Sequence, residues 1–521
     1  MSDPRQARAF RFVSCGFDAA TGTATLRYAF DDGVELVERI VFPAAPAIAP
    51  GREAAFGAAL RLLHLVAGVS YYKAGVPAQI RIEGEPLDAD TAALADEVYR
   101  HGLAEFAYQN GFHKIGIDLR ERIRFPFVDR HPRERGDPVP FAESRELDSR
   151  VRGNDERMDS RVRGNDERGG SGFRGNDGQI DSRVKGNDEQ ARTRVGRNDE
   201  RGDLAPAIGL PRRTLLPIGG GKDSLVSVEQ CKAIGEPATA VWIGDSALIA
   251  ACAARTGLPL LNIKRQLAPE LFEYNREGAW NGHVPVTAIN SAILLCAAVL
   301  YGFDAIAFSN ERSASSATLE YDGQQVNHQW SKGIDFERRL RAYVRAHVAA
   351  DLDYFSLLRP WSELAVARAF VKATQYDDAF SSCNRNFRIL GAHPADRWCG
   401  QCPKCHFVFL ALAPFMAKPR LLRIFGRNLL DDATLAPGFD ALLEYRNHKP
   451  FECVGEGAES RAAMHALTQR AEWREDALVA RFAKEILPQL GASALAIEPL
   501  LAPAPEHFLP ARFARLLAAG E

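Results

Sequence analysis

The chain has 521 residues, and its 65 lysines and arginines nearly balance 67 aspartates and glutamates, giving a formal net charge of −2. This balance provides no bulk attraction to nucleic acid. The first residues contain no apolar stretch of signal-peptide type, and the longest apolar run, around 288–303, is too short to span a membrane. We therefore expect a cytoplasmic protein of two to four domains that binds neither nucleic acid nor membrane.

The first segment, residues 1–131, has the pattern of a small α+β domain. Alternating apolar and polar residues predict two strands of a hairpin, and apolar residues at helical spacing predict two helices. The expected strands are 23–30 and 34–42, and the expected helices are 52–68 and 90–111.

Between those helices lies "GVSYYKAG", which contains Tyr71, Tyr72 and Lys73. The simplest interpretation is that the tyrosines pack half-buried and that Lys73 is solvated. Tyr72 and Lys73 are also candidate substrate-binding residues.

Residues 132–203 contain a repeat of period 11, with Gly-Asn-Asp triplets starting at 153, 164, 175 and 186. An 11-residue period can mark a right-handed coiled coil, but that structure needs an apolar seam. Each repeat offers about one apolar residue, too few to offset the entropy of ordering it. We expect a disordered insertion, with a linker or interaction role as the alternative.

From residue 204 the pattern changes to alternating strands and helices, which predicts an α/β domain over 204–380 with a parallel sheet covered on both faces. The expected strands lie within 212–221, 238–244, 258–265 and 304–311, and the expected helices within 222–235, 246–257 and 287–302. Residues 421–521 are expected to be a helical C-terminal region.

A glycine-rich turn follows the first of these strands and precedes a helix. Glycines let the backbone approach an anion, and the helix N-terminus adds a favourable dipole. The spacing fits neither a Walker A loop nor a dinucleotide-binding fingerprint. The turn consists of Gly219, Gly220, Gly221, Lys222, Asp223 and Ser224.

This turn resembles the S-G-G-x-D-S loop of the PP-loop ATP pyrophosphatases, with Gly219 in place of the first serine. The resemblance implies an adenine nucleotide α-hydrolase-like core in which all six turn residues bind ATP and pyrophosphate. ATP would be cleaved between its α and β phosphates, with Mg²⁺ screening the phosphate charge.

Four of the nine cysteines cluster in sequence: Cys383, and then Cys399, Cys402 and Cys405 with C-x₂-C-x₂-C spacing. Four thiolates suit a tetrahedral Zn²⁺, which predicts a zinc knuckle over 381–420. A redox C-x-x-C pair and an Fe–S cluster are the alternatives. The other cysteines are isolated, which argues against a disulfide framework. The arrangement resembles the zinc knuckle of the 7-cyano-7-deazaguanine synthases, which are also PP-loop enzymes.

Three further segments, "YNREGAWNGHVPVTAINS", "AFSNERSASSATLEYDGQQVNHQWSKGIDFERRLRAYV" and "YFSLLRPWSELAVARAF", resemble the UDP-N-acetylmuramoyl-L-alanyl-L-glutamate epimerases of peptidoglycan synthesis. The resemblance covers nearly the whole chain except about 132–203. It implies conversion of the terminal L-glutamate of a UDP-linked muramoyl dipeptide to D-glutamate, with ATP giving AMP and pyrophosphate. It also implies roles in cell-wall formation and division, and a functional pairing with a ligase that adds L-glutamate.

Polar side chains that follow predicted element boundaries are candidates for the proton-transfer chemistry. The candidate catalytic residues are His283, Glu311 and His328, and the further candidate substrate-binding residues are Asn310, Arg312 and Lys332. A single histidine is more often a structural hydrogen-bonding residue, and Arg312 or Lys332 could equally form a surface salt bridge.

Two other functions fit parts of this pattern. Another adenylating PP-loop enzyme, either an amidotransferase-type ligase or a base-modifying enzyme, would share the turn and the cysteines. A zinc-bearing binding module with a vestigial loop would not need Lys222, Asp223 and Ser224, which are all present. The near-neutral charge disfavours an enzyme that acts on RNA.

Overall fold

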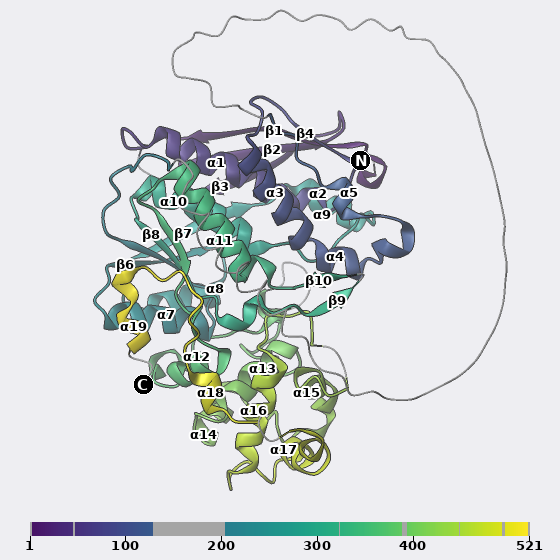
Figure 1. Cartoon of the computed structure of the whole chain (residues 1–521), viewed down its shortest axis with the longest axis vertical. Helices are drawn as coiled ribbons and strands as arrows, with labels where there is room; N and C mark the ends of the chain where they lie inside the picture. The colour runs from purple at the N-terminus through teal and green to yellow at the C-terminus, as the bar shows by residue number, and fades with distance from the viewer. Residues whose placement is uncertain are drawn as a thin grey trace, which may run out of the picture. The chain divides into compact units, whose positions relative to one another are not determined.

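A computed structural model of the protein describes residues 3–44, 47–128, 204–321, 323–387, 393–446, 449–491 and 495–518. The predicted insertion at 132–203 lies outside these residues. Nine of the described strands form one mixed sheet in the order β11-β8-β5-β6-β7-β3-β2-β1-β4 (Figure 1). The strands are β1 (Ala9–Asp18), β2 (Thr23–Phe30), β3 (Leu36–Val41), β4 (Gln79–Ile82), β5 (Thr214–Pro217), β6 (Ala238–Ile243), β7 (Leu260–Gln266), β8 (Ala305–Phe308) and β11 (Asp353–Ser356). A separate hairpin pairs β9 (Leu319–Tyr321) with β10 (Gln324–Val326).

One half of the sheet is parallel, as the sequence predicts. Five neighbouring strands pair in parallel, in the spatial order β11, β8, β5, β6, β7. In the sequence they follow one another as β5, β6, β7, β8 and β11. The strand order therefore reverses between β5 and β8. In doubly wound sheets, ligands bind beyond the carboxyl ends of the strands at such a reversal.

The N-terminal strands extend this same sheet. The predicted hairpin of β2 and β3 is confirmed, and β3 pairs antiparallel with β7, with Arg39 opposite Gln266. Strands β1 and β4 were not predicted; β1 lies between β2 and β4. One continuous sheet therefore contains strands from residues 1–131 and from residues 204–380. The predicted domain boundaries stay a prediction.

Helices pack on the sheet and form the C-terminal part of the fold, as expected. The predicted helix over 90–111 is interrupted at Leu103, so it forms two helices. The helices of the described residues are α1 (Glu53–Ala67), α2 (Val69–Tyr72), α3 (Ala89–Gly102), α4 (Ala104–Gln109), α5 (Leu119–Arg122), α7 (Lys222–Ala233), α8 (Ala247–Ala254), α9 (Pro269–Arg276), α10 (Val286–Tyr301), α11 (Ile334–Tyr343), α12 (Glu363–Phe370), α13 (Pro403–Leu412), α14 (Lys418–Phe425), α15 (Ala436–Leu442), α16 (Gly457–Thr468), α17 (Ala477–Arg481), α18 (Glu498–Leu501) and α19 (Arg515–Ala518).

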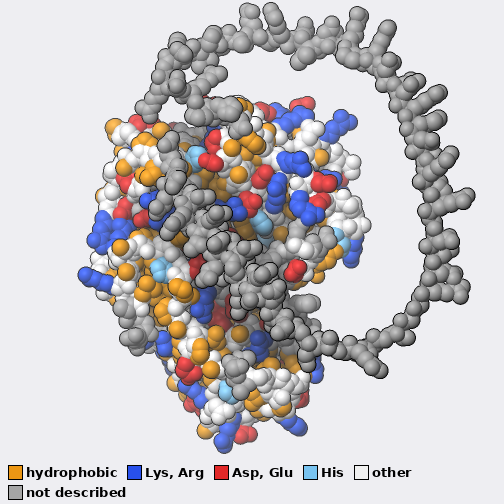
Figure 2. Space-filling view, viewed as in Figure 1, with side chains coloured by type: hydrophobic (Ala, Val, Ile, Leu, Met, Phe, Trp, Pro, Cys, Tyr) orange, Lys and Arg blue, Asp and Glu red, His pale blue; other side chains and the backbone are white. Residues whose placement is uncertain are grey.

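The helical stretch Glu53–Tyr72 is long and apolar enough to cross a membrane, but 78% of its most apolar part is buried inside the protein. The core helices of soluble proteins can be equally long and apolar, so this stretch is weak evidence for a membrane span. On the face in Figure 2, basic and acidic side chains are interspersed, in keeping with the net charge of −2.

Candidate active site

The glycine turn lies at the carboxyl end of β5, where the strand order reverses. Gly220 has a φ of +78°, a conformation that favours glycine. The backbone N–H of Ser381 donates to the Gly220 carbonyl at 3.0 Å, so a neighbouring segment supports the turn from one side. A Cβ atom built on Gly219 would meet no atom within 4 Å, which shows that the turn is open on another side.

The start of α7 is not capped by a side chain. Its N-cap residue, Gly221, provides no side-chain hydrogen bond. Ser224 Oγ donates to the Gly221 carbonyl at 3.0 Å and lies 3.4 Å from the backbone nitrogen of Gly219. The helix dipole and the exposed turn together suit an anion at this position.

Lys222 and Asp223 form the buried side of the turn. The Lys222 ammonium is fully buried and pairs with the carboxylates of Asp223 and of Glu363, at the start of α12. Burial lowers the pKa of Lys222, but the two carboxylates outweigh burial and raise it. Lys222 is thus a charged buried residue held between carboxylates, and it does not project freely from the turn.

A second group of side chains, the acid–base cluster, consists of Glu105, His283, His328, Lys332 and Cys453. Lys332 Nζ donates to Cys453 Sγ at 3.1 Å. His328 Nδ1 lies 2.5 Å from Glu105 Oε2, and His283 Nδ1 lies 3.9 Å from the same oxygen. The two imidazole rings are 4.4 Å apart. Glu105, His283 and His328 thus bring three potential proton-exchanging or metal-ligating groups together.

The environment of this cluster shifts three pKa values. Burial raises the pKa of Cys453, but Lys332, the hydrogen bond with His328, and Lys404 outweigh it and lower the value to about 5. Burial lowers the pKa of His328, but Cys453 and Glu105 raise it to about 9. Burial, together with the charges of His328 and Lys332, lowers the pKa of His283 to about 3.

Asn310 and Glu311 follow β8 at the other side of the strand-order reversal. Asn310 Nδ2 donates to Ser356 Oγ at 3.0 Å, and Ser313 Oγ donates to Glu311 Oε1 at 3.1 Å. Both residues are buried. Burial, together with the nearby carboxylates of Glu363 and Asp223, raises the pKa of Glu311 to about 7.

Arg359, which the sequence analysis did not identify, positions the backbone around these residues. Its guanidinium is only 2% exposed and pairs with Glu337 at 2.9 Å. It also donates to the carbonyl of Glu311 at 2.7 Å and to the carbonyl of Lys332 at 2.5 Å. One buried cation therefore fixes the spacing between two candidate site residues.

Lys404 connects the glycine turn to the acid–base cluster. Its ammonium lies 3.6 Å from Glu363 Oε1, and it donates to the backbone carbonyl of Cys453. Glu363 in turn pairs with Lys222 of the turn. The two groups of residues therefore form one continuous polar site.

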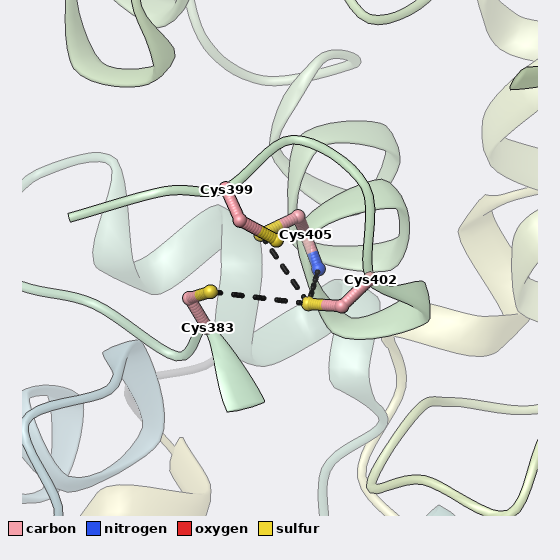
Figure 3. Close-up of side chains that lie close together, drawn as sticks. All are labelled: Cys383, Cys399, Cys402 and Cys405. Atoms are coloured by element: carbon pink, nitrogen blue, oxygen red, sulfur yellow. Dashed lines mark hydrogen bonds between the residues drawn. The ribbon is translucent and has the colours of Figure 1, made fainter. Parts of the chain in front are cut away.

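The four clustered cysteines converge in space as well as in sequence (Figure 3). Their sulfur atoms lie within 4.8 Å of one another, with Cys402 Sγ 3.5 Å from Cys405 Sγ and 4.0 Å from Cys383 Sγ. All nine cysteines are free in this structure. A tetrahedron of Zn–S bonds of about 2.3 Å has edges of about 3.8 Å, so these sulfurs are arranged as a zinc site requires.

The predicted environments of Tyr71, Tyr72 and Lys73 are wrong. Both tyrosines are fully buried, because they pack against other aromatic rings of the N-terminal core. Lys73 is also buried, and its ammonium donates to Asn281 Oδ1 at 2.5 Å. Burial lowers the pKa of Lys73 to about 8. Lys73 thus lies beside the loop that carries His283, whereas the Tyr72 hydroxyl donates to the Pro77 carbonyl.

Arg312 has different neighbours from the other candidates. Its guanidinium donates to the backbone carbonyls of Leu500 at 3.3 Å and Ala502 at 3.5 Å. These contacts attach the segment after β8 to the C-terminal part of the chain, and a role of Arg312 in substrate binding stays a prediction.

The fold and the site define an α/β protein in which a glycine turn at a helix N-terminus adjoins buried groups with strongly shifted pKa values, as is typical of an enzyme. Comparison with known families then identifies it further. The chain belongs to the MurL family: residues 1–145 and 181–357 match the MurL N-terminal domain, and residues 379–496 match the MurL C-terminal domain.

Three relatives similar over nearly their whole length carry the same name, "UDP-N-acetyl-alpha-D-muramoyl-L-alanyl-L-glutamate epimerase". The protein of Xanthomonas oryzae pv. oryzae is 52% identical over 98% of this chain and 96% of its own. Those of Salinispora tropica and Micromonospora sp. are 36% and 37% identical, over 98% and 99% of this chain and 96% and 98% of their own.

Proposed function

We propose that this protein converts the terminal L-glutamate of UDP-N-acetylmuramoyl-L-alanyl-L-glutamate to D-glutamate in peptidoglycan synthesis. The reaction would use ATP and release AMP and pyrophosphate. The observation that carries the proposal is the 52% identity, over 98% of this chain, to a protein named as this epimerase.

The chemistry explains why an epimerase would need ATP. A free α-carboxylate makes the Cα proton very weakly acidic, because the carbanion would form beside a negative charge. Transfer of AMP to the carboxylate removes that charge and gives an acyl group that can accept the electron pair as an enolate. Removal of the Cα proton, return of a proton on the other face, and hydrolysis of the mixed anhydride complete the reaction.

The glycine turn is the proposed site of adenylation, which would place the protein among the PP-loop enzymes. The strand order, the uncapped start of α7 and the open side of Gly219 support this assignment. The turn residues Gly219 to Ser224 would hold the phosphates. Mg²⁺ would neutralise part of the phosphate charge when bound with ATP.

The four cysteines are proposed to hold a structural Zn²⁺. All four thiolates would be ligands, which leaves no open position for a substrate. The segment that carries Cys383 also supports the glycine turn, because Ser381 binds the Gly220 carbonyl and Ser382 lies against Gly221. The metal would therefore stabilise the nucleotide site without taking part in the reaction.

The acid–base cluster is the proposed site of proton transfer. In this cluster the pKa of His328 is raised past neutrality, and Lys332 offers a partly buried cation for a developing enolate or a substrate carboxylate. Glu311, outside the cluster, has a pKa raised to about 7 and is a further candidate for the proton transfer. His283, Asn310 and Lys73 border the same region and would orient the substrate.

Chirality of the glutamate in the product tests the proposed function. The protein would be incubated with the UDP-linked muramoyl-L-alanyl-L-glutamate, ATP and Mg²⁺, and the glutamate released by acid hydrolysis would be resolved by chiral chromatography. We expect D-glutamate to appear together with AMP and pyrophosphate. Retention of L-glutamate with formation of a new amide would instead identify an amidotransferase-type ligase and overturn the proposal.

The substrate also implies a reaction that precedes this one. Its L-glutamate must be added to the UDP-linked muramoyl-L-alanine by an ATP-dependent ligase, so we propose that such a ligase acts immediately upstream. Both substrates are water-soluble nucleotides, in keeping with a cytoplasmic reaction.

A further inference from the structure

Cys453 has an environment unlike that of the other cysteines outside the four-cysteine cluster. It lies between α15 and α16, and its side chain is partly exposed. Its sulfur accepts a hydrogen bond from Lys332 Nζ at 3.1 Å, and Lys332 and His328 both lower the pKa of the thiol. Two cationic side chains therefore act on one thiol, the environment that favours a reactive thiolate.

The cationic state of His328 is itself supported by the fold. Glu105 of α4 contacts His328 Nδ1 at 2.5 Å, so a carboxylate stabilises the imidazolium. Glu105, His328 and Cys453 are thus ordered as a carboxylate, an imidazole and a thiol. The same order of groups activates a nucleophile or a base in many enzymes. Its members come from distant parts of the sequence.

The thiol also lies close to the glycine turn. The Cys453 carbonyl accepts a hydrogen bond from Lys404, Lys404 lies 3.6 Å from Glu363, and Glu363 pairs with Lys222. A substrate carboxylate that receives AMP at the turn would thus lie within a few side chains of Cys453.

Glu311 complements this thiol. A carboxyl group ordinarily loses its proton at a lower pH than a thiol. In this site the order is reversed, because the pKa of Glu311 is raised to about 7 and that of Cys453 is lowered to about 5. The two groups are also linked in space, because Arg359 donates to the backbone carbonyls of Glu311 and Lys332, and Lys332 donates to Cys453. An acid and a base held near each other are the pattern of an acid–base pair.

We propose that Cys453 and Glu311 are the two groups that exchange the Cα proton on opposite faces of the adenylated glutamate. In one direction the Cα–H bond breaks as the S–H bond of Cys453 forms, and the electron pair moves to the acyl oxygen. The O–H bond of Glu311 then breaks as the new Cα–H bond forms, and the pair returns to Cα. Cys453 ends protonated and Glu311 ends ionised, and exchange with solvent restores both.

This inference rests on the proposed function, so the experiment separates the two. Wild-type protein, Cys453→Ser and the control Cys15→Ser would be compared for AMP release and for incorporation of solvent deuterium at Cα, starting from each epimer. Cys15 is a partly exposed thiol on β1 whose pKa burial raises. If wild-type protein does not epimerise the substrate, the proposed function itself is wrong, whatever the variants do.

We expect Cys453→Ser to release AMP at a rate within about threefold of wild type, while deuterium incorporation from one epimer falls by about 10² to 10⁴-fold. Cys15→Ser should match wild type in both measurements. Unchanged deuterium incorporation in Cys453→Ser would overturn the inference. A folded Cys453→Ser that loses AMP release as well would also overturn it, because the thiol would then serve substrate binding.

A measurement on the wild-type protein covers the case in which the variant does not fold. Alkylation by iodoacetamide, located by peptide mass spectrometry, should modify Cys453 with a pH midpoint near 5, and ATP with substrate should protect it. Cys15 should react only at alkaline pH. A midpoint above pH 8 at Cys453, or a trapped thioester between Cys453 and the substrate, would contradict the assignment of this thiolate as a base.

Discussion

The glycine turn and the acid–base cluster occupy one polar site but are built in different ways. The turn is a contiguous run of six residues that presents backbone N–H groups, and its one cation, Lys222, is neutralised by two carboxylates. The cluster is made of side chains from α4 and from three separate loops, and its pKa values are shifted from their usual ranges.

This difference matches two different physical tasks. Phosphate keeps its charge during the reaction, so fixed backbone dipoles can bind it without changing their own state. A Cα proton must be taken and returned, so the groups that handle it need side chains with protonation states set by their neighbours. Substitutions in the turn, the cysteine cluster and the acid–base groups should therefore have separable effects.

Replacement of Asp223 by alanine should remove ATP cleavage and deuterium incorporation together, each by about 10³-fold or more. Lys222 would lose one of its two carboxylate partners, and the start of α7 would no longer have the geometry to hold phosphate. AMP release and Cα deuteration would be measured on the same samples, with the exposed Asp32→Ala as control. Deuteration that persists without ATP cleavage would show that adenylation does not activate the Cα proton.

Loss of the metal should affect the turn more than the acid–base cluster. Cys402→Ser, or chelation of the purified protein, should lower the free energy of unfolding by more than about 4 kcal/mol and should weaken ATP binding. Metal analysis should find about one Zn²⁺ per chain in the wild-type protein. Normal stability in protein shown to be metal-free would contradict a structural zinc site.

The raised pKa of Glu311 makes a prediction about stability and pH. The folded state binds this proton more tightly than the unfolded state, so the stability it contributes is present below pH 4.5 and is lost as the pH rises through about 7. Glu311→Gln does not ionise, so at pH 8 it should be more stable than wild type by about 3 kcal/mol. Urea unfolding at both pH values measures this difference.

The advantage of Glu311→Gln should disappear at pH 4.5, and the variant should still release AMP while it loses Cα exchange from one epimer. Equal stability of the two proteins at pH 8 would mean that Glu311 is ionised in the folded state at no cost. The proposed pair of Cys453 and Glu311 would then lose its acid.

His283→Gln should give the smallest effect, a decrease in Cα exchange of no more than about tenfold. The lowered pKa of His283 keeps its imidazole neutral, so glutamine can replace a neutral hydrogen-bonding group. His328→Gln is the matched comparison, because it removes the cation beside Cys453 and should cost more. A larger loss in His283→Gln than in His328→Gln would contradict the role of His328 as the cation that supports the Cys453 thiolate.

Local sequence patterns predicted much of the framework. The alternation in 23–30 gave β2, and the helical spacing in 52–68 gave α1, since each pattern determines which face of its own element is apolar. The strand, glycine turn and helix around Gly220 could be predicted for the same reason, because every residue involved is a sequence neighbour of the next.

Strands β1 and β4 were not predicted, for two different reasons. β4 has only four residues, and its pairing with β1 is a long-range contact that local alternation does not specify. β1 pairs with β2 across a short turn that ends at Gly22, a local signal that the sequence analysis missed.

Local sequence was enough to predict most helices and strands, the glycine turn and the four cysteines with metal-ligand spacing. The tertiary structure alone decided that Cys453 faces Lys332 and His328, that Arg359 holds the backbone beside Glu311, and that Lys73 is buried. The reason is that a pKa depends on burial and on charges within a few ångströms, and in this site those charges come from segments more than a hundred residues apart in the chain.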